Sequence, residues 1–201
     1  MRLFVLSRHG ESTLNLENRV NGDPSVPVAL TENGREAAAR LGAQVAGLPV
    51  ELGIHTRFER TRETLEIALS GRDVPIVTEP LLDDIDVGEL EGDTLDAYRA
   101  WKRSHQRSEP FPGGESLDDA ARRYARAFRA LLARPERCVL VVFHEIPLRY
   151  AINAAADSAE LDGPSRLIAN ATPYLFDERS LERATARIES LVGGTQGSGG
   201  E

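Results

Sequence analysis

The stretch Val5-Leu6-Ser7-Arg8-His9-Gly10-Glu11-Ser12 decides the fold that this sequence predicts. Its apolar start indicates a buried strand, and the strand ends at an arginine, an imidazole and a glycine. In open α/β folds, ligands bind at the carboxyl edge of the sheet, where such a strand presents its last side chains. Arg8 offers permanently charged, planar donors for phosphate, and His9 can act as a nucleophile, a base or a metal ligand. Gly10 allows a sharp turn close to a bulky anion.

Further strands are indicated by short apolar or β-branched runs between turn residues. The run Val139–Phe143 is apolar throughout, which is typical of a strand covered on both faces. A short polar turn around Glu178–Leu181 joins the last two segments and predicts an antiparallel hairpin at one edge of the sheet. The expected strands are Leu3–Ser7, Leu52–His55, Pro75–Thr78, Cys138–Phe143, Thr172–Asp177 and Ala184–Glu189.

Helical patterns alternate with the first four strands. One follows the N-cap residue Thr31 over about 32–47, and a second covers about 57–69. Ser116 and Asp119 resemble a capping box that opens a helix to about residue 133, and Pro147 suits the first turn of another helix. This alternation predicts a three-layer α/β/α sandwich with a mostly parallel sheet and an antiparallel edge strand.

Length and composition indicate one globular domain over residues 1–192, followed by a Gly/Ser-rich tail, 193–201, that we expect to be disordered. No apolar stretch approaches the roughly 20 residues that cross a membrane, and the N-terminus lacks a signal-peptide pattern. Cys138 is the only cysteine; it suits a small core residue in a reducing cytoplasm. The net charge of −8 argues against nucleic acid and anionic membranes as partners. A small anionic substrate remains compatible, because local fields set its affinity.

Two other segments repeat the chemistry of the first strand end. The strand Cys138–Phe143 is followed directly by His144, and Thr56-Arg57-Phe58-Glu59-Arg60 follows another strand and opens a helix. The sequence therefore predicts an anion pocket in which Arg8, His9, Arg60 and His144 meet at one rim.

These blocks, in this order, resemble the histidine phosphatase superfamily, which has the phosphoglycerate-mutase-like fold. The resemblance extends from residue 2 to about 176. It rests on Arg8–Ser12 with Asn15, on Gly22 with Leu30–Gly34, on Thr56 with Arg60–Thr64, on Gly88-Glu89-Leu90-Glu91-Gly92, on Gly113–Ser116, on Val141–His144 and on Asn170.

The resemblance implies a phosphatase in which His9 attacks phosphorus and becomes a phosphohistidine. Arg8, Asn15, Arg60 and His144 would hold the phosphoryl oxygens, so that no metal or other cofactor is expected. In many members of the family a carboxylate four residues before the Gly-x-x-Glu-Gly block protonates the leaving group. That position is Asp84 here, and with His9 and His144 it completes the expected catalytic set.

Two positions depart from the family's pattern. Asp84 stands where glutamate is usual and is one methylene shorter; Asp83, Asp86 and Glu89 are nearby alternatives. Glu145 follows His144 where the family normally has glycine. We expect Glu145 to point away from the pocket or to pair with an arginine such as Arg57, or else to act as a specificity element. Arg57 is also unusual for the family and is expected in a surface salt bridge.

Three functions follow as hypotheses. The first is hydrolysis of a small phosphorylated metabolite. The second is a mutase, which is disfavoured because the 20 residues between Gly92 and Gly113 are fewer than mutases of this family tend to have. The third is a phospho-ligand-binding protein without turnover. The sequence names no substrate and leaves a homodimer open. The aromatic residues Tyr98, Trp101 and Phe111 either line a lid or pack a helix, and packing is favoured.

Overall fold

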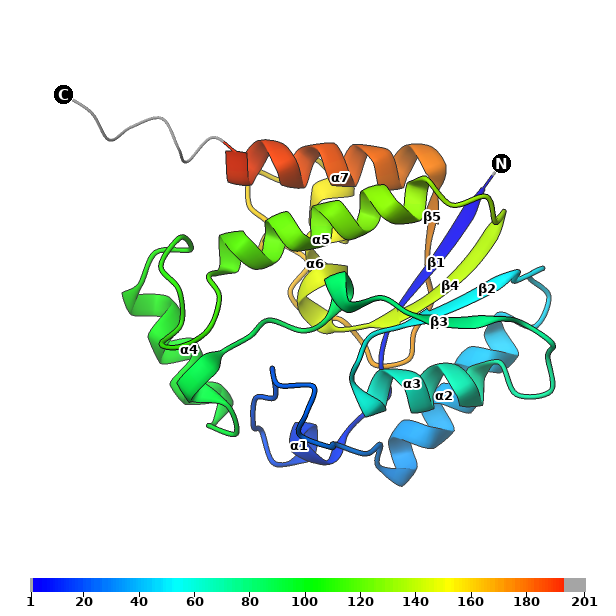
Figure 1. The fold of residues 1–201 in the computed structure, drawn as a ribbon, viewed down its shortest axis with the longest axis horizontal. Helices are drawn as coiled ribbons and strands as arrows, with labels where there is room; N and C mark the ends of the chain where they lie inside the picture. Colours follow the sequence, from blue (N-terminus) through cyan, green and yellow to red (C-terminus); the bar gives the residue numbers. More distant parts are fainter. Residues whose placement is uncertain (1, 194–201) are drawn as a thin grey trace.

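A mixed sheet of five strands forms the centre of the structure, a computed structural model that describes residues 2–193 (Figure 1). The strand order is β3-β2-β4-β1-β5, and all neighbours are parallel except β1 and β5. The strands are β1 (Leu3–Arg8), β2 (Leu52–His55), β3 (Ile76–Thr78), β4 (Cys138–Phe143) and β5 (Tyr174–Asp177). The predicted sheet with its antiparallel edge strand is confirmed.

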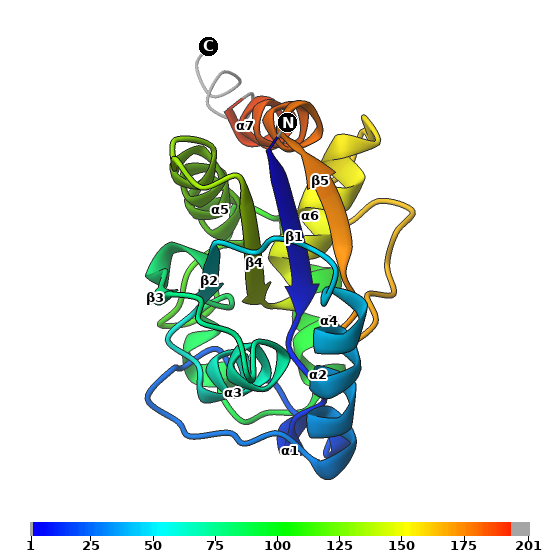
Figure 2. The same cartoon turned by 90° about the vertical axis from the view of Figure 1, so that its right-hand side faces the viewer.

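Helices cover both faces of this sheet, which makes three layers (Figures 1 and 2). Helices α5 (Leu117–Leu132), α6 (Glu145–Ala155) and α7 (Glu178–Gly193) lie on one face, and α2 (Glu32–Gln44) and α3 (Glu59–Ala68) lie on the other. Successive strand residues serve the two cores alternately: Phe4 and Leu6 pack in the core with α5 to α7, and Val5 packs with Leu41 and Leu65. The apolar runs of β1 and β4 are continuous because both faces of these strands are buried.

The predicted helix starts are supported by their caps. The hydroxyl of Thr31 accepts the backbone N–H of Gly34 at 3.0 Å, and the hydroxyl of Ser116 accepts that of Asp119 at 3.0 Å. Helix α6 begins at Glu145, directly after β4, with Pro147 in its first turn. This start places His144 at the junction of a strand and a helix.

The predicted strand Ala184–Glu189, and with it the hairpin, is wrong. These residues belong to α7, which buries Leu181, Ala184, Ile188 and Val192. That spacing of three and four residues is helical, although the local alternation of small and polar residues resembles a strand. Asp177 precedes α7 and caps its N-terminus, because its carboxylate accepts the backbone N–H of Ser180 at 2.7 Å. Gly193 of the predicted tail ends α7, and the rest of that tail lies outside the described residues.

Several short elements lie beyond the carboxyl ends of β1 and β4 (Figures 1 and 2). They are α1 (Thr13–Leu16), α4 (Leu95–Ser104) and two 3-10 turns, Pro80–Leu82 and Gly88–Leu90. Tyr98 and Trp101 of α4 both stack on Phe111, at 5.5 and 4.1 Å between ring centroids, so their predicted packing is confirmed. Within residues 2–193, no helix combines the length and apolar character needed to cross a bilayer.

The segment after β1 is held against the start of α2 by close backbone contact. A Cβ on Gly10 would lie 2.5 Å from the carbonyl oxygen of Gly34, and a Cβ on Gly34 would lie 2.1 Å from that of Glu11. Only glycine fits such an approach. The contact fixes the turn that carries His9.

Candidate active site

The site forms where β1, β4 and the first turn of α3 come together. His9 follows β1, Arg60 lies in the first turn of α3, and His144 is the N-cap residue of α6. Arg60 joins them: its Nε lies 3.1 Å from Nε2 of His9 and its Nη2 lies 3.2 Å from Nδ1 of His144. The structure thus brings together these three predicted side chains.

His9 is buried and has a defined tautomer. Its Nδ1 lies 2.6 Å from the carbonyl oxygen of Gly10, so Nδ1 carries the proton and donates. Nε2 is then unprotonated and accepts the N–H of Arg60. Burial and the nearby charges of Arg60 and Arg8 hold the pKa of His9 well below its usual value. The imidazole is neutral and presents a lone pair on Nε2.

His144 is fully buried, and its ring packs edge-on against Phe58 at 4.6 Å between centroids. Its Nδ1 accepts from Arg60, which leaves the proton on Nε2 for the hydroxyl of Thr56 at 3.0 Å. Burial and the charge of Arg60 lower the pKa of His144 well below its usual value. The ring is therefore held rigidly beside Arg60 as a neutral group.

Asp84 lies beside both Arg60 and His144. Its Oδ2 is 3.3 Å from Nη2 of Arg60 and 3.3 Å from Nδ1 of His144. Desolvation raises the pKa of this carboxyl group, and the charge of Arg60 only partly opposes the effect. Such a carboxyl group can hold a proton at a pH where an exposed aspartate has lost it. The role of Asp84 as the acid stays a prediction.

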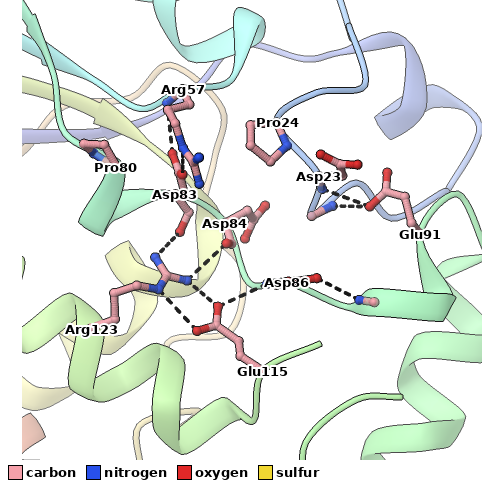
Figure 3. A pocket seen from close by; sticks show the side chains of 12 residues that line it. Asp23, Pro24, Arg57, Pro80, Asp83, Asp84, Asp86, Glu91, Glu115 and Arg123 are labelled. Carbon is pink, nitrogen blue, oxygen red and sulfur yellow. Dashed lines mark hydrogen bonds and ion pairs between the residues drawn. The ribbon is translucent and has the colours of Figure 1, made fainter. Parts of the chain in front are cut away.

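The backbone that carries Asp84 is fixed from α5 by Arg123 (Figure 3). The guanidinium of Arg123 donates to the carbonyl oxygens of Asp83 and Asp84 at 2.9 and 3.2 Å and pairs with Glu115. The alternative carboxylate Asp83 is committed elsewhere, because it binds Nε of Arg57 at 2.5 Å. The predicted surface salt bridge of Arg57 is thereby found, and its partner is Asp83.

Glu145 pairs with arginines, as one of the expectations had it, but the partners are Arg8 and Arg149 instead of Arg57, and its side chain lies in the site instead of pointing away. Its carboxylate is 2.9 Å from Nη1 of Arg8 and 3.2 Å from Nη1 of Arg149. Helix α6 starts immediately after β4, so its first side chain emerges beside the end of β1. Arg8 also donates to the carbonyl oxygen of Ile168 at 3.0 Å.

Asn15 lies in the same site, but its Oδ1 accepts the backbone N–H of Ser12 at 3.0 Å in a capping box. Its contact with phosphate stays a prediction.

Asn21 was not predicted, yet both its side-chain and its backbone oxygen accept from Arg60. The carboxylate of Glu91 binds the backbone N–H groups of Gly22 and Asp23 at 2.6 and 3.0 Å (Figure 3). In the sequence, Gly22 and the Gly-x-x-Glu-Gly block are the signals for this loop, although neither indicates their mutual contact.

A cavity of about 430 Å³ opens over these groups. Its wall carries far more positive than negative charge, although the whole chain is acidic. The basic residues are Arg8, Arg19, Arg60, Arg99, Lys102, Arg149 and Arg166, and the acidic ones are Asp84 and Glu145. Such a cavity favours an anionic ligand. Among residues 2–193, no cluster of three or more His, Cys, Asp or Glu side chains is arranged to hold a metal ion.

Comparison with known proteins places this geometry in a family. Residues 4–187 match the model of the histidine phosphatase superfamily (branch 1). A 2,3-bisphosphoglycerate-dependent phosphoglycerate mutase 2 from Gloeobacter violaceus is 38% identical over 140 residues, which are 64% of this chain and 62% of that protein. The match thus spans less than two thirds of that relative.

Two further proteins are similar over more of their length. A probable phosphoglycerate mutase, GpmB, from Erwinia tasmaniensis is 32% identical over 74% of this chain and 72% of its own. The structure of YhfR from Bacillus stearothermophilus superimposes with a TM-score of 0.76 and 29% identity, over 87% of this chain and 90% of that one. From its sequence and its fold, this chain belongs to the histidine phosphatase superfamily.

Proposed function

We propose that this protein is a phosphatase that hydrolyses a small phosphomonoester through a phosphohistidine at His9. The observation that carries the proposal is the neutral imidazole of His9, whose unprotonated Nε2 lies 3.1 Å from Arg60. A nucleophile held beside a fixed cation suits attack on an anionic phosphoryl group, because the cation offsets the charge that gathers in the transition state.

In the first step, the phosphoryl group accepts the N–H of Arg60 in place of His9, which frees the lone pair on Nε2 of His9. Nε2 then attacks phosphorus in line, and the bond from phosphorus to the leaving oxygen breaks. Asp84, protonated because its pKa is raised, gives its proton to the leaving alkoxide. In the second step, water attacks the phosphohistidine while the Asp84 carboxylate takes one of its protons. Inorganic phosphate leaves, and His9 and Asp84 regain their starting states.

The equatorial phosphoryl oxygens would be held by Arg8, Arg60 and Asn15. The predicted contact of His144 with phosphate requires a second proton on its ring, because in the neutral ring Nδ1 accepts from Arg60 and Nε2 donates to Thr56. Both arginines are permanently charged and fixed by several contacts, so little reorganisation accompanies the reaction. The proposal assigns this stabilisation to side chains of the chain itself, without a cofactor.

A mutase is the second candidate, since both sequence relatives described above are named as phosphoglycerate mutases. Hydrolysis is favoured by the short segment between Gly92 and Gly113, which holds α4 and one loop. A mutase would pass the phosphoryl group to a second hydroxyl of its substrate, and a phosphatase passes it to water. A binding protein without turnover is the third reading.

Rapid quenching with a ³²P-labelled phosphomonoester tests these readings. We expect acid-labile label on the wild-type protein, none on His9→Ala, and steady release of inorganic phosphate. His105→Ala is the matched control, because this exposed histidine stacks on Trp101 away from the cavity lining. Label without phosphate release, together with isomerised substrate, would identify a mutase. Binding without label or turnover would leave the third reading.

We also propose a cytoplasmic location. The single cysteine, Cys138, is buried in β4 as a thiol, which suits a reducing compartment. Fractionation of cells that express the chain tests this.

A further inference from the structure

The candidate acid lies on a segment without regular secondary structure. Asp84 falls between the two 3-10 turns, Pro80–Leu82 and Gly88–Leu90, and no strand or helix of the described chain includes it. An aspartate side chain is short, so the place of its carboxyl group is set almost entirely by the backbone that carries it. Whatever fixes this backbone therefore decides whether the carboxyl group can reach the leaving oxygen.

Arg123 of α5 binds this backbone with its whole guanidinium group (Figure 3). Nη1 donates to the carbonyl oxygens of Leu81 and Asp83 at 3.0 and 2.9 Å, and Nη2 donates to that of Asp84 at 3.2 Å. The remaining N–H groups, on Nε and Nη2, donate to the two carboxylate oxygens of Glu115. Every N–H group of the guanidinium is thus engaged, in a planar arrangement that only arginine offers.

Glu115 extends this hold to the residue that follows Ile85. Its Oε1 accepts the backbone N–H of Asp86 at 3.1 Å (Figure 3). Its own backbone N–H donates to the carbonyl oxygen of Asp86 at 3.0 Å. Arg123 and Glu115, which we call the clamp, therefore hold the backbone on both sides of Asp84.

The neighbouring side chain ties the same segment to the start of α3. Oδ1 of Asp83 accepts the backbone N–H of Arg57 at 2.9 Å, and Oδ2 binds Nε of Arg57 at 2.5 Å (Figure 3). Arg60, in the first turn of α3, lies 3.3 Å from Oδ2 of Asp84. The segment is thus held between α3 and α5, with the carbonyl group of Asp84 toward Arg123 and its carboxyl group toward Arg60.

We propose that Arg123 and Glu115 are positioning residues for proton transfer: the clamp fixes the backbone so that the short side chain of Asp84 reaches the leaving oxygen. Neither residue lines the cavity over His9, so neither would touch the substrate. The inference rests on the proposed function, in which Asp84 protonates the leaving group. It adds two residues outside the cavity to that function.

The ratio of two rates within one variant tests the clamp. The kcat for propyl phosphate depends on proton donation, and the kcat for p-nitrophenyl phosphate depends on it little. In Arg123→Met we expect the propyl-to-nitrophenyl ratio to fall by about tenfold or more, because displacement of a reacting group by about 1 Å can cost about 10² in rate. The folded fraction of a variant scales both rates equally, so a loss of stability alone leaves the ratio unchanged.

Further substitutions separate position from charge. Arg123→Lys keeps the positive charge, but an ammonium group cannot bind the three carbonyl oxygens and Glu115 together, so the ratio should still fall by about threefold or more. Glu115→Gln should lower it in the same direction. Arg126→Met is the matched control: Arg126 is exposed on the same helix, lies outside the clamp, and should leave the ratio unchanged. A ratio fully restored in Arg123→Lys would assign the effect to charge and overturn the proposal.

Combination with Asp84→Asn shows whether the clamp acts through the candidate acid. Arg123→Met should lower the ratio in the wild-type background and should not change it further in Asp84→Asn. An equal reduction in both backgrounds, or an equal loss of both rates in Arg123→Met, would overturn the proposal. So would an unchanged ratio in Asp84→Asn alone, and label at His9 would then still support the proposed function.

Failure of the proposed function itself gives a different result. If the wild type releases phosphate from neither compound, that function fails, and the pKa of Asp84 decides separately whether the clamp positions this residue. A ¹³C NMR titration of the carboxyl group measures it. Burial raises this pKa in the intact site, so Arg123→Met should move it down toward the ordinary aspartate value. An unchanged pKa would reject the clamp.

Discussion

Nε of Arg60 lies 3.1 Å from Nε2 of His9, so the lone pair of the candidate nucleophile accepts a hydrogen bond from the guanidinium group. The same guanidinium contacts Asp84 and His144 and stacks over Phe58 at 4.3 Å from the ring centre. Arg60 therefore orients the nucleophile, the candidate acid and the second imidazole together. Burial lowers the pKa of Arg60 only to about 10, so it stays charged at neutral pH.

Replacement of Arg60 by alanine should reduce kcat by about 10²–10³, as removal of one preorganised donor does in other enzymes. The loss should be similar for all phosphomonoesters, because each presents the same phosphoryl group. Arg62→Ala is the control, since Arg62 lies exposed on the same helix and pairs with Glu66. A drop in Arg60→Ala no larger than in the control would remove Arg60 from the mechanism.

Asp84→Asn separates proton donation from charge. Alkyl phosphates have poor leaving groups that need a proton, so their kcat should fall by about 10²–10⁴. With p-nitrophenyl phosphate, whose leaving group departs without protonation, the loss should be about tenfold or less. Glu89→Gln changes an exposed neighbouring carboxylate and should alter neither rate. Equal losses on both substrates in Asp84→Asn would exclude Asp84 as the acid.

The pH profile of kcat/KM should be bell-shaped and displaced toward acid. The reaction needs neutral His9, so the lowered pKa of His9 moves the acidic limb to lower pH. It also needs protonated Asp84, so the raised pKa of that group moves the basic limb to higher pH than an ordinary aspartate allows. Initial rates with an alkyl phosphate measure both limbs. In Asp84→Asn the basic limb should disappear, and its persistence would assign that limb to another group.

Glu145 competes with phosphate for Arg8, because its carboxylate is 2.9 Å from Nη1 of that residue. Glu145→Gln removes the negative charge while it keeps the side-chain length. The inhibition constant of inorganic phosphate should fall by about three- to tenfold, with a smaller effect at high salt. Glu160→Gln, in an exposed loop, should leave inhibition unchanged. Weaker phosphate binding in Glu145→Gln would instead show that Glu145 mainly positions Arg8.

Gly34→Ala should lower the free energy of unfolding by about 1–3 kcal/mol, although alanine is normally the better helix residue. Its Cβ would lie 2.1 Å from the carbonyl oxygen of Glu11, so the backbone near His9 must shift. Gly47→Ala is the control, because a Cβ there meets nothing within 4 Å. Urea denaturation of both variants measures the difference, and equal stabilities would contradict the close packing.

The sheet and much of the site could be predicted because the decisive signals are local. The apolar runs of β1 and β4 end directly at Arg8 and at His144, so neighbouring parallel strands bring these residues to one edge. The register, which pairs Arg8 with Phe143, follows from that arrangement. The segment Thr56–Arg60 follows β2 in the same way.

What could not be predicted depends on contacts between distant segments. The sequence around Glu145 does not indicate that its carboxylate, at the end of β4, reaches Arg8 at the end of the adjacent strand β1. The alternation in Ala184–Glu189 fits either a strand or a helix, and only the packing of α7 on α5 and α6 makes the helix the better solution. The loop of Asn21 is held by Glu91, 70 residues away.

The contacts around His9 link parts of the chain that are remote in sequence. Arg60 lies 51 residues from His9, and the side chain of Asn170 donates to the carbonyl oxygen of His9 across 161 residues. No isolated fragment can therefore reproduce the reacting geometry, and partial unfolding at either end of the chain separates His9 from the residues that position it. Loss of turnover during denaturation should consequently coincide with loss of the whole tertiary structure, which makes enzymatic rate a direct reporter of cooperative folding.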